Sequence, residues 1–92
     1  MSHLTKTKAK LLARVRRLKG QIEAIERAIE AEEACSVILN QVASVRGAVT
    51  GLTAELIEDH IRNHVVDPDR EADPDRAQGA ADLIDVMRTY LK

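Results

Sequence analysis

Apolar side chains recur along most of this chain with the period of an α-helix, and this recurrence restricts its fold more than any other feature. From about Thr5 to Glu30 they follow one another at spacings of three and four residues, so they form a single stripe on one helix. A second stripe with heptad-like spacing lies between about Cys35 and Val65, and His60 continues it. The stripes consist of Leu11, Val15, Leu18, Ile22, Ile25 and Ile29, and of Ile38, Val42, Val45, Val49, Leu52 and Leu56. Two long amphipathic helices are therefore predicted.

A third helix is predicted near the C-terminus. Pro68 ends the second helix, because the residue before a proline disfavours the helical conformation, and a polar linker over 67–73 follows. Asp73 is typical of a helix N-cap, with Pro74 at the first helical position. The helix is expected to extend to about Leu91. Its apolar face consists of Ala80, Ile84, Met87 and Leu91.

These patterns predict an all-α fold. No residue between Glu30 and Cys35 breaks a helix by its chemistry, so the residues alone also allow one very long helix across that stretch. Hydrophobic residues make up 45% of the chain but aromatic residues only 1%, a composition that suits helix–helix seams better than a sheet. A chain of 92 residues fits a single domain over 1–92. Its core is thin, so we expect oligomerisation to complete it.

The chain has one cysteine, Cys35. A thiol without a partner in its own chain favours a reducing compartment. No apolar run approaches the length of a membrane span, and the N-terminal segment lacks the hydrophobic stretch of a signal peptide. We therefore expect a cytoplasmic protein with no membrane partner.

Positive charge is concentrated in the first helix, although the formal net charge of the chain is −1. Seven of the 14 Lys and Arg residues lie between Lys6 and Lys19, and no acidic residue occurs before Glu23. Solvated helix faces are the usual alternative, but such faces normally mix the two signs, whereas guanidinium groups in a row suit phosphate oxygens. At 100° per residue, a basic row beside the apolar stripe consists of Lys10, Arg14, Arg17 and Gln21, with Arg16 and Lys19 on its far flank.

The kind of nucleic acid follows from what the chain lacks. Tyr90 is its single aromatic residue, and proteins that bind RNA or single strands usually stack bases on aromatic rings. No short helix-turn-helix is evident in the sequence. The predicted partner is therefore double-stranded DNA, bound through its backbone and its shape.

A histidine pair near the end of the second helix is a candidate for metal binding. His60 and His64 are four residues apart, so both project from the same side of the helix. Cys35 lies in the same angular sector but about 37 Å away along the axis. A second copy paired antiparallel about Ala48 would bring Cys35 of one chain beside the histidines of the other, which predicts a twofold dimer with two identical sites.

Cys35 and the histidine pair also fit roles that involve no metal. A cysteine is often an inert buried hydrophobe, and histidines near a helix C-terminus often complement the helix dipole. The residues alone leave a metal site and these alternatives about equal. No base lies within one turn of Cys35, no glycine-rich phosphate loop is present, and no paired carboxylates stand out. A binding protein is therefore favoured over an enzyme.

Several segments of the chain resemble the CsoR/RcnR/FrmR family of bacterial metal- or formaldehyde-responsive repressors. They are residues 14–21, Cys35, residues 41–48, residues 55–60 and residues 90–92. The resemblance implies three helices with a break near residues 31–34, and an antiparallel dimer with a four-helix-bundle core that assembles as a tetramer. It also implies sensor sites between subunits and a basic row that holds operator DNA until an effector weakens the contact.

The subfamilies of this family differ at a few ligand positions, and the residues at these positions distinguish which effector each subfamily binds. The copper(I) sensors are similar at Cys35 and His60 but have a cysteine where this chain has His64, so the soft two-thiolate site is absent. His3, Cys35, His60 and His64 match the ligand set of the nickel/cobalt type. The resemblance therefore implies a repressor that releases DNA on binding Ni(II) or Co(II), with zinc as a further ion that could bind in vitro.

Two alternatives remain. The formaldehyde sensors of the same family use the cysteine and the N-terminal amine, which here means Cys35 and the amine of residue 1 or 2. They resemble this chain in residues 14–21, but they carry a proline at position 2 and a carboxylate in place of His64, where this chain has Ser2 and His64. A purely structural helical protein is the other alternative, and it leaves the basic row and the histidines unexplained.

Overall fold

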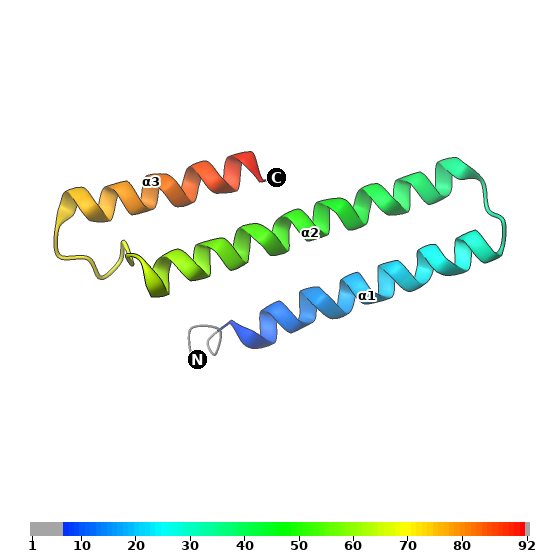
Figure 1. Cartoon of the computed structure of the whole chain (residues 1–92), viewed down its shortest axis with the longest axis horizontal. Helices are drawn as coiled ribbons and strands as arrows, with labels where there is room; N and C mark the ends of the chain where they lie inside the picture. The colour runs from blue at the N-terminus through cyan, green and yellow to red at the C-terminus, as the bar shows by residue number, and fades with distance from the viewer. Residues whose placement is uncertain (1–6, 92) are drawn as a thin grey trace.

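The computed structural model describes residues 7–91 and consists of three helices. α1 spans Lys8–Glu30, α2 spans Cys35–His64 and α3 spans Pro74–Tyr90, and no strand occurs among the residues described. α1 and α2 form an antiparallel hairpin, and α3 folds back along the C-terminal half of α2 (Figure 1). The predicted all-α fold is confirmed.

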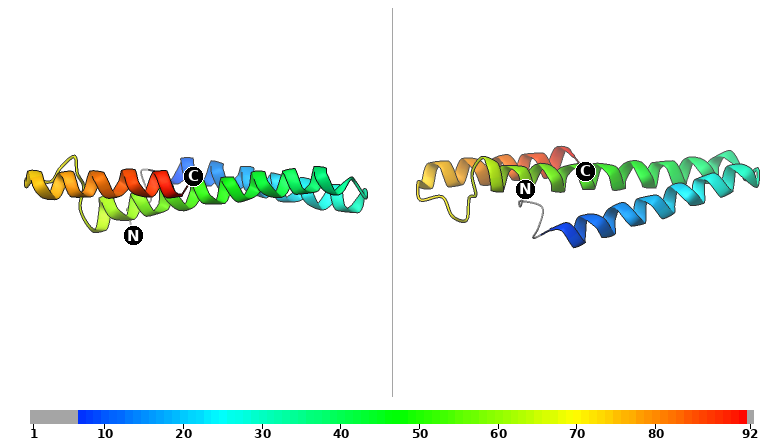
Figure 2. Two further views of the ribbon diagram at one scale, coloured as in Figure 1. Left: turned by 90° about the horizontal axis from the view of Figure 1, so that it is seen from above. Right: turned by 60° about the horizontal axis from the view of Figure 1, so that its bottom comes forward.

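The three helices lie side by side in one layer, with α2 in the middle (Figures 1 and 2). The chain measures 58 × 26 × 13 Å, so its thinnest dimension is about that of a single helix with its side chains. α1 and α3 do not pack on each other over the residues described. A layer of this kind buries little, and its core consists of Leu11, Leu18, Ala28, Ile61, Ala80 and Ile84.

A turn at residues 31–34 separates α1 from α2, as the family resemblance implied. Glu32 has a φ of 55°, in the left-handed region. The amide of Glu32 donates to the carbonyl of Ile29, and the amide of Glu33 donates to the carbonyl of Ala28, both at 3.0 Å. These two bonds form a Schellman motif, which usually has glycine at the left-handed position. Because Glu32 replaces that glycine, the residues alone gave no sign of the break.

The linker between α2 and α3 is held by aspartate side chains. Asp67 accepts a hydrogen bond of 3.0 Å from the amide of Asp69, and it also accepts one from Arg62. Asp73 accepts a bond of 2.9 Å from the amide of Asp75, and Pro74 is the first residue of α3. The predicted N-cap is therefore confirmed, and so is the predicted apolar face of α3, since Ala80 and Ile84 are buried.

The other two apolar stripes are only partly covered. In α1, Leu11 and Leu18 are buried, whereas Val15, Ile22 and Ile29 are 45%, 55% and 58% exposed. In α2, the exposed part of the stripe consists of Val42, Val49 and Leu56. The single chain thus carries apolar surface along the very positions that were expected to be buried. Among the residues described, no helix is long and apolar enough to cross a membrane.

Candidate functional site

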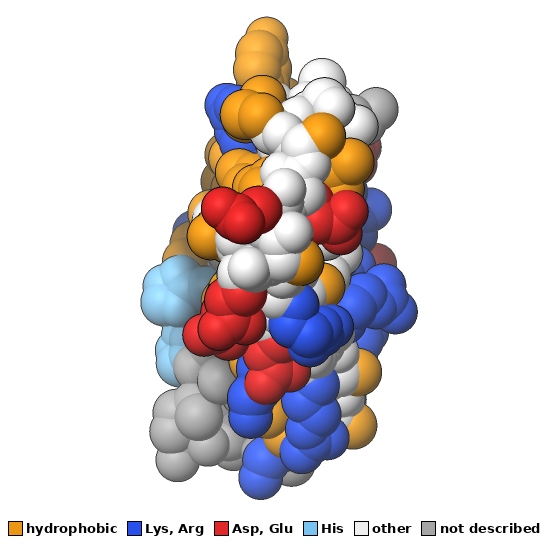
Figure 3. Space-filling model, turned by 90° about the vertical axis from the view of Figure 1, so that its right-hand side faces the viewer, with side chains coloured by type: hydrophobic (Ala, Val, Ile, Leu, Met, Phe, Trp, Pro, Cys, Tyr) orange, Lys and Arg blue, Asp and Glu red, His pale blue; other side chains and the backbone are white. Residues whose placement is uncertain are grey.

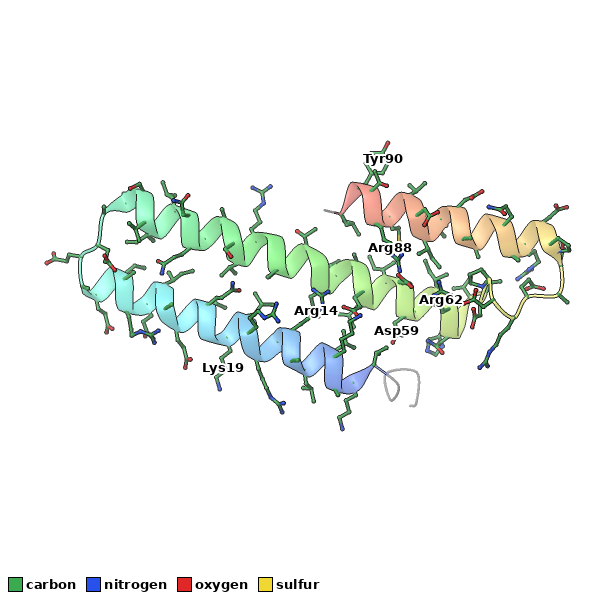
Figure 4. All side chains as sticks on the ribbon, turned by 180° about the vertical axis from the view of Figure 1, so that it is seen from behind. Arg14, Lys19, Asp59, Arg62, Arg88 and Tyr90 are labelled. Atoms are coloured by element: carbon green, nitrogen blue, oxygen red, sulfur yellow. The ribbon has the colours of Figure 1, made fainter. Side chains whose placement is uncertain are left out.

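The six residues predicted to bind DNA all lie on α1, but they divide into two groups. Arg16, Arg17 and Lys19 are exposed, and Lys19 points away from α2 while Arg14 points toward it (Figure 4). Seen from the end of the molecule that carries the α1–α2 turn, Lys and Arg side chains gather along one side, opposite the described histidines (Figure 3). One part of the predicted set therefore faces solvent, and the other part contacts α2, although the side chain of Lys10 remains 67% exposed.

Lys10 and Arg14 form ion pairs with α2. Lys10 Nζ lies 2.9 Å from Glu55 Oε1, and Arg14 Nε lies 2.6 Å from Glu55 Oε2. Glu55 Oε2 is buried and lacks the alignment of a hydrogen bond, so the contact with Arg14 is electrostatic rather than directional. One turn further along α2, Asp59 accepts a hydrogen bond of 3.2 Å from Thr7 Oγ1. The start of α1 is thus attached to two acidic residues of α2.

Gln21, the last residue of the basic row, also faces α2. Its side-chain amide donates a hydrogen bond of 3.2 Å to Ser44 Oγ. Its Oε1 atom is buried without a hydrogen-bond partner, as is Oε1 of Gln41. Gln21 is therefore placed in the α1–α2 interface rather than on the solvent-facing side of α1.

A cleft of about 410 Å³, with mostly charged residues in its lining, lies where the start of α1 meets the C-terminal half of α2. Its charged lining consists of Lys10, Arg14, Glu55, Glu58, Asp59, Arg62 and Arg88. The cleft also contains Gly51. A Cβ atom at that position would lie 3.1 Å from Arg14 Nη1, so the missing side chain makes room for the guanidinium group.

Glu58 links α2 to α3 next to this cleft. It accepts hydrogen bonds from Arg62 Nε at 3.0 Å and from Arg88 Nε at 2.9 Å, and both arginines point into the space between the helices (Figure 4). Burial opposes ionisation of Glu58, but the hydrogen bonds from Arg62 and Arg88 and their positive charges outweigh it. The pKa of Glu58 therefore lies below its ordinary value. The pKa of Arg62 is raised, chiefly by the same hydrogen bond to Glu58.

The predicted metal ligands lie at the two ends of α2. The rings of His60 and His64 are stacked with their centroids 5.0 Å apart, and both residues are exposed. Cys35 is exposed at the first residue of α2, about 37 Å from His60 by the helical rise. Within residues 7–91, no three His, Cys, Asp or Glu side chains are grouped to hold an ion. His3 lies outside the described residues.

The donor chemistry fits a late transition metal. Two imidazoles on adjacent turns reach one ion, and imidazole with a thiolate suits nickel, cobalt or zinc rather than magnesium or calcium. A single chain supplies the two histidines at one place. The thiolate of Cys35 lies at the opposite end of α2, so it does not join them within one chain.

The sequence patterns predicted no role for five charged residues of the cleft: Glu55, Glu58, Asp59, Arg62 and Arg88. Glu55 and Asp59 are four residues apart, so they lie on the same side of α2. Two acidic residues one turn apart, opposite a helix that has no acidic residue before Glu23, are the signal that could have located the contact. To predict the contact from these residues, one must also know the register of the α1–α2 hairpin, which the sequence does not reveal.

Comparison with known proteins adds an independent line of evidence. A family model described as a metal-sensitive transcriptional repressor matches residues 7–89. The chain is 50% identical over 92 residues to an uncharacterised protein in the bioA 5′ region of Serratia marcescens, with full coverage of both chains. It is 36% identical over 93 residues to the transcriptional repressor RcnR of Salmonella paratyphi B, again with full coverage of both.

The fold is also similar to a solved structure. This is a histidine-for-glutamate variant of the formaldehyde-responsive regulator FrmR from Salmonella enterica serovar Typhimurium. The TM-score is 0.65 and the identity 43%, over 92% of this chain and 94% of that chain. The chain thus belongs to the family of metal-sensitive transcriptional repressors that includes CsoR, RcnR and FrmR, whose members are repressors and not enzymes.

Proposed function

We propose that this protein represses transcription by binding double-stranded operator DNA, and that it releases the DNA when Ni(II) or Co(II) binds. The observation that carries the proposal is the stacked pair of His60 and His64 on the same face of α2 as Cys35. Membership of the metal-sensitive repressor family supplies the regulatory setting. The free thiol of Cys35 is consistent with action in the cytoplasm.

A second copy of the chain completes the proposed site. Val42, Val49 and Leu56 form an exposed apolar strip along α2, with Cys35 near one end and His60 near the other. Two strips that pair antiparallel about Ala48 bury this surface and bring opposite ends together. Cys35 of one subunit, with His60 and His64 of the other, would then hold the ion. Two such dimers would form the proposed tetramer.

The choice of metal rests on His64, which stands where the copper(I) sensors have a second cysteine. With one thiolate and at least two imidazoles, the donor set favours nickel or cobalt over copper(I), and it also permits zinc in vitro. His3 is proposed as a further ligand. Because His3 precedes α1 by only a few residues, its coordination would connect the metal site to the start of the helix that carries the basic row.

DNA binding is proposed for the basic row and its flank. Arg16, Arg17 and Lys19 are exposed on α1 and are available to phosphate oxygens. Lys10 and Arg14 belong to the same surface, but they are paired with Glu55 in the structure. A coupling of about 1–3 kcal/mol between effector and DNA would change DNA affinity about 5- to 150-fold, as is typical of allosteric proteins.

Formaldehyde is the second candidate effector. It is favoured by the 43% identity to a formaldehyde-responsive regulator and by the exposure of Cys35, which leaves its thiol accessible. In this alternative the thiol of Cys35 and the N-terminal amine react with the aldehyde carbon. Ser2 and His64 argue against formaldehyde, because the formaldehyde sensors that this chain resembles carry a proline and a carboxylate at these two positions.

Titration of fluorescence anisotropy on the DNA upstream of the protein's own gene tests these candidates. Nickel, cobalt, zinc, copper(I) and formaldehyde are added separately to the protein–DNA complex. We expect release by nickel or cobalt, and loss of that release in Cys35→Ala and His64→Glu. Asn63→Ala, in the same exposed turn, is the matched control and should retain it. Release by formaldehyde but by no metal would contradict the proposal and make Cys35 a nucleophile.

A further inference from the structure

Glu55 occupies an unusual position for a carboxylate on this molecule. Its side chain is only 18% exposed, and both of its oxygens contact cations of α1. The neighbouring Glu58 is already engaged by Arg62 and Arg88, and Asp59 accepts the hydroxyl of Thr7. Among the acidic residues that line the cleft, Glu55 is thus the one that neutralises the basic row.

The surroundings of Glu55 are shaped to accept Arg14. The guanidinium group lies against Gly51, where a Cβ atom would come within 3.1 Å of Nη1. Since Gly51 is four residues before Glu55 on α2, its bare backbone lets the arginine reach the carboxylate along the helix surface. By contrast, the described part of the chain shows no ion pair for Arg16, Arg17 or Lys19.

A guanidinium or ammonium group that pairs with a carboxylate cannot give all of its hydrogen bonds to a phosphate at the same time. DNA must therefore either share Lys10 and Arg14 with Glu55 or displace it. Displacement would leave a largely buried carboxylate without its partners, which is costly. Either way, Glu55 lowers the affinity of α1 for a polyanion.

We propose that Glu55 is an internal competitor of DNA phosphate that holds Lys10 and Arg14 against α2 and thereby limits the DNA affinity of the repressor. The inference rests on the proposed function in one respect, that DNA binds along the basic row. It adds a residue of α2, five positions before His60, that controls two cations of α1. The same contact connects the helix of the histidines to the helix that faces DNA.

The test compares four proteins by anisotropy titration on the same duplex at one salt concentration. Glu55→Gln should bind DNA about three- to tenfold more tightly than the unchanged protein, given the usual strength of partly exposed ion pairs. Glu23→Gln is the matched control, because it removes one negative charge from an exposed position of α1 for which the described residues show no ion pair. It should change the affinity by much less. Arg17→Ala tests the DNA face itself and should weaken binding.

A second comparison shows whether Glu55 acts through the two cations. In a Lys10→Ala/Arg14→Ala background, Glu55→Gln should have no more effect than Glu23→Gln. Circular dichroism of each variant verifies that its helices are retained. If Glu55→Gln merely equals Glu23→Gln while Arg17→Ala still weakens binding, the inference about Glu55 is wrong and the proposed DNA face stands. If Arg17→Ala has no effect, the proposed DNA face itself fails.

Discussion

Glu32, in the turn after α1, has a backbone conformation that residues with a Cβ atom rarely adopt. Its φ of 55° permits the two hydrogen bonds of the Schellman motif, so the conformation is required by the turn. A residue other than glycine in the left-handed region costs about 1–2 kcal/mol. Local strain is therefore present at the point where the chain reverses direction.

Glu32→Gly should remove this strain. We expect the free energy of unfolding to rise by about 0.5–1 kcal/mol, since the relief exceeds the greater entropy of glycine in the unfolded chain. Urea unfolding followed by circular dichroism measures the change. Glu33→Gly is the control: it removes the same charge one residue later, where φ is not positive, and should not stabilise the protein. Equal stabilisation by both variants would point to charge repulsion instead.

At the scale of the helices, α3 is attached to α2 by apolar contacts and by one carboxylate. Ile84 and Ala80 are buried, and Glu58 receives Arg88 from α3 and Arg62 from its own helix. Arg62 in turn reaches Asp67 and Asp69 in the linker, at 3.3 and 3.1 Å. The ionised form of Glu58 therefore stabilises the end of α2, the linker and α3 together.

This arrangement predicts a pH dependence of stability. The pKa of folded Glu58 lies below its ordinary value of 4.5, so its contribution is complete above that value and is lost as the pH falls through the folded pKa. Urea unfolding at a series of acidic pH values should show this loss. Glu58→Gln should be less stable at neutral pH and should show a flatter dependence below about pH 4.5. Asp85→Asn, at an exposed position of α3, should leave the slope unchanged.

At the scale of the whole molecule, the flat layer leaves α2 exposed between its two neighbours. The buried residues are few, and the apolar strip of Val42, Val49 and Leu56 along α2 remains exposed. A core this thin supplies little stability to a chain of this size. If a second copy of the chain packed against this strip, the apolar surface buried between the two copies would enlarge the core.

Val49→Glu tests this dependence directly. In the proposed dimer, a carboxylate in the centre of this strip would lack a partner, so it would weaken the association by roughly 2–3 kcal/mol, on the order of 100-fold. Sedimentation velocity should then show a smaller species than for the unchanged protein. Asn40→Glu, exposed on another side of α2, is the matched control and should leave the assembly intact. An unchanged species in Val49→Glu would exclude this strip as the interface.

The sequence by itself determined the helices, because a helix depends on residues three and four positions apart. The period of the apolar residues located the helical segments, although it did not separate α1 from α2, and the pair Asp73–Pro74 located the start of α3 to the residue. The same period placed His60 and His64 on one side of α2. Each of these predictions concerns contacts within a single element.

Only the tertiary structure decided what lies between the elements. The periodicity grouped Lys10, Arg14 and Arg17 in one row, but it did not show that the first two pair with Glu55, which lies far along the chain on the next helix. That pairing depends on the register of the α1–α2 hairpin. The register depends in turn on the turn at Glu32, where backbone hydrogen bonds outweigh the preference of the side chain. Contacts between distant segments follow from packing, and packing is not encoded in the period of any one helix.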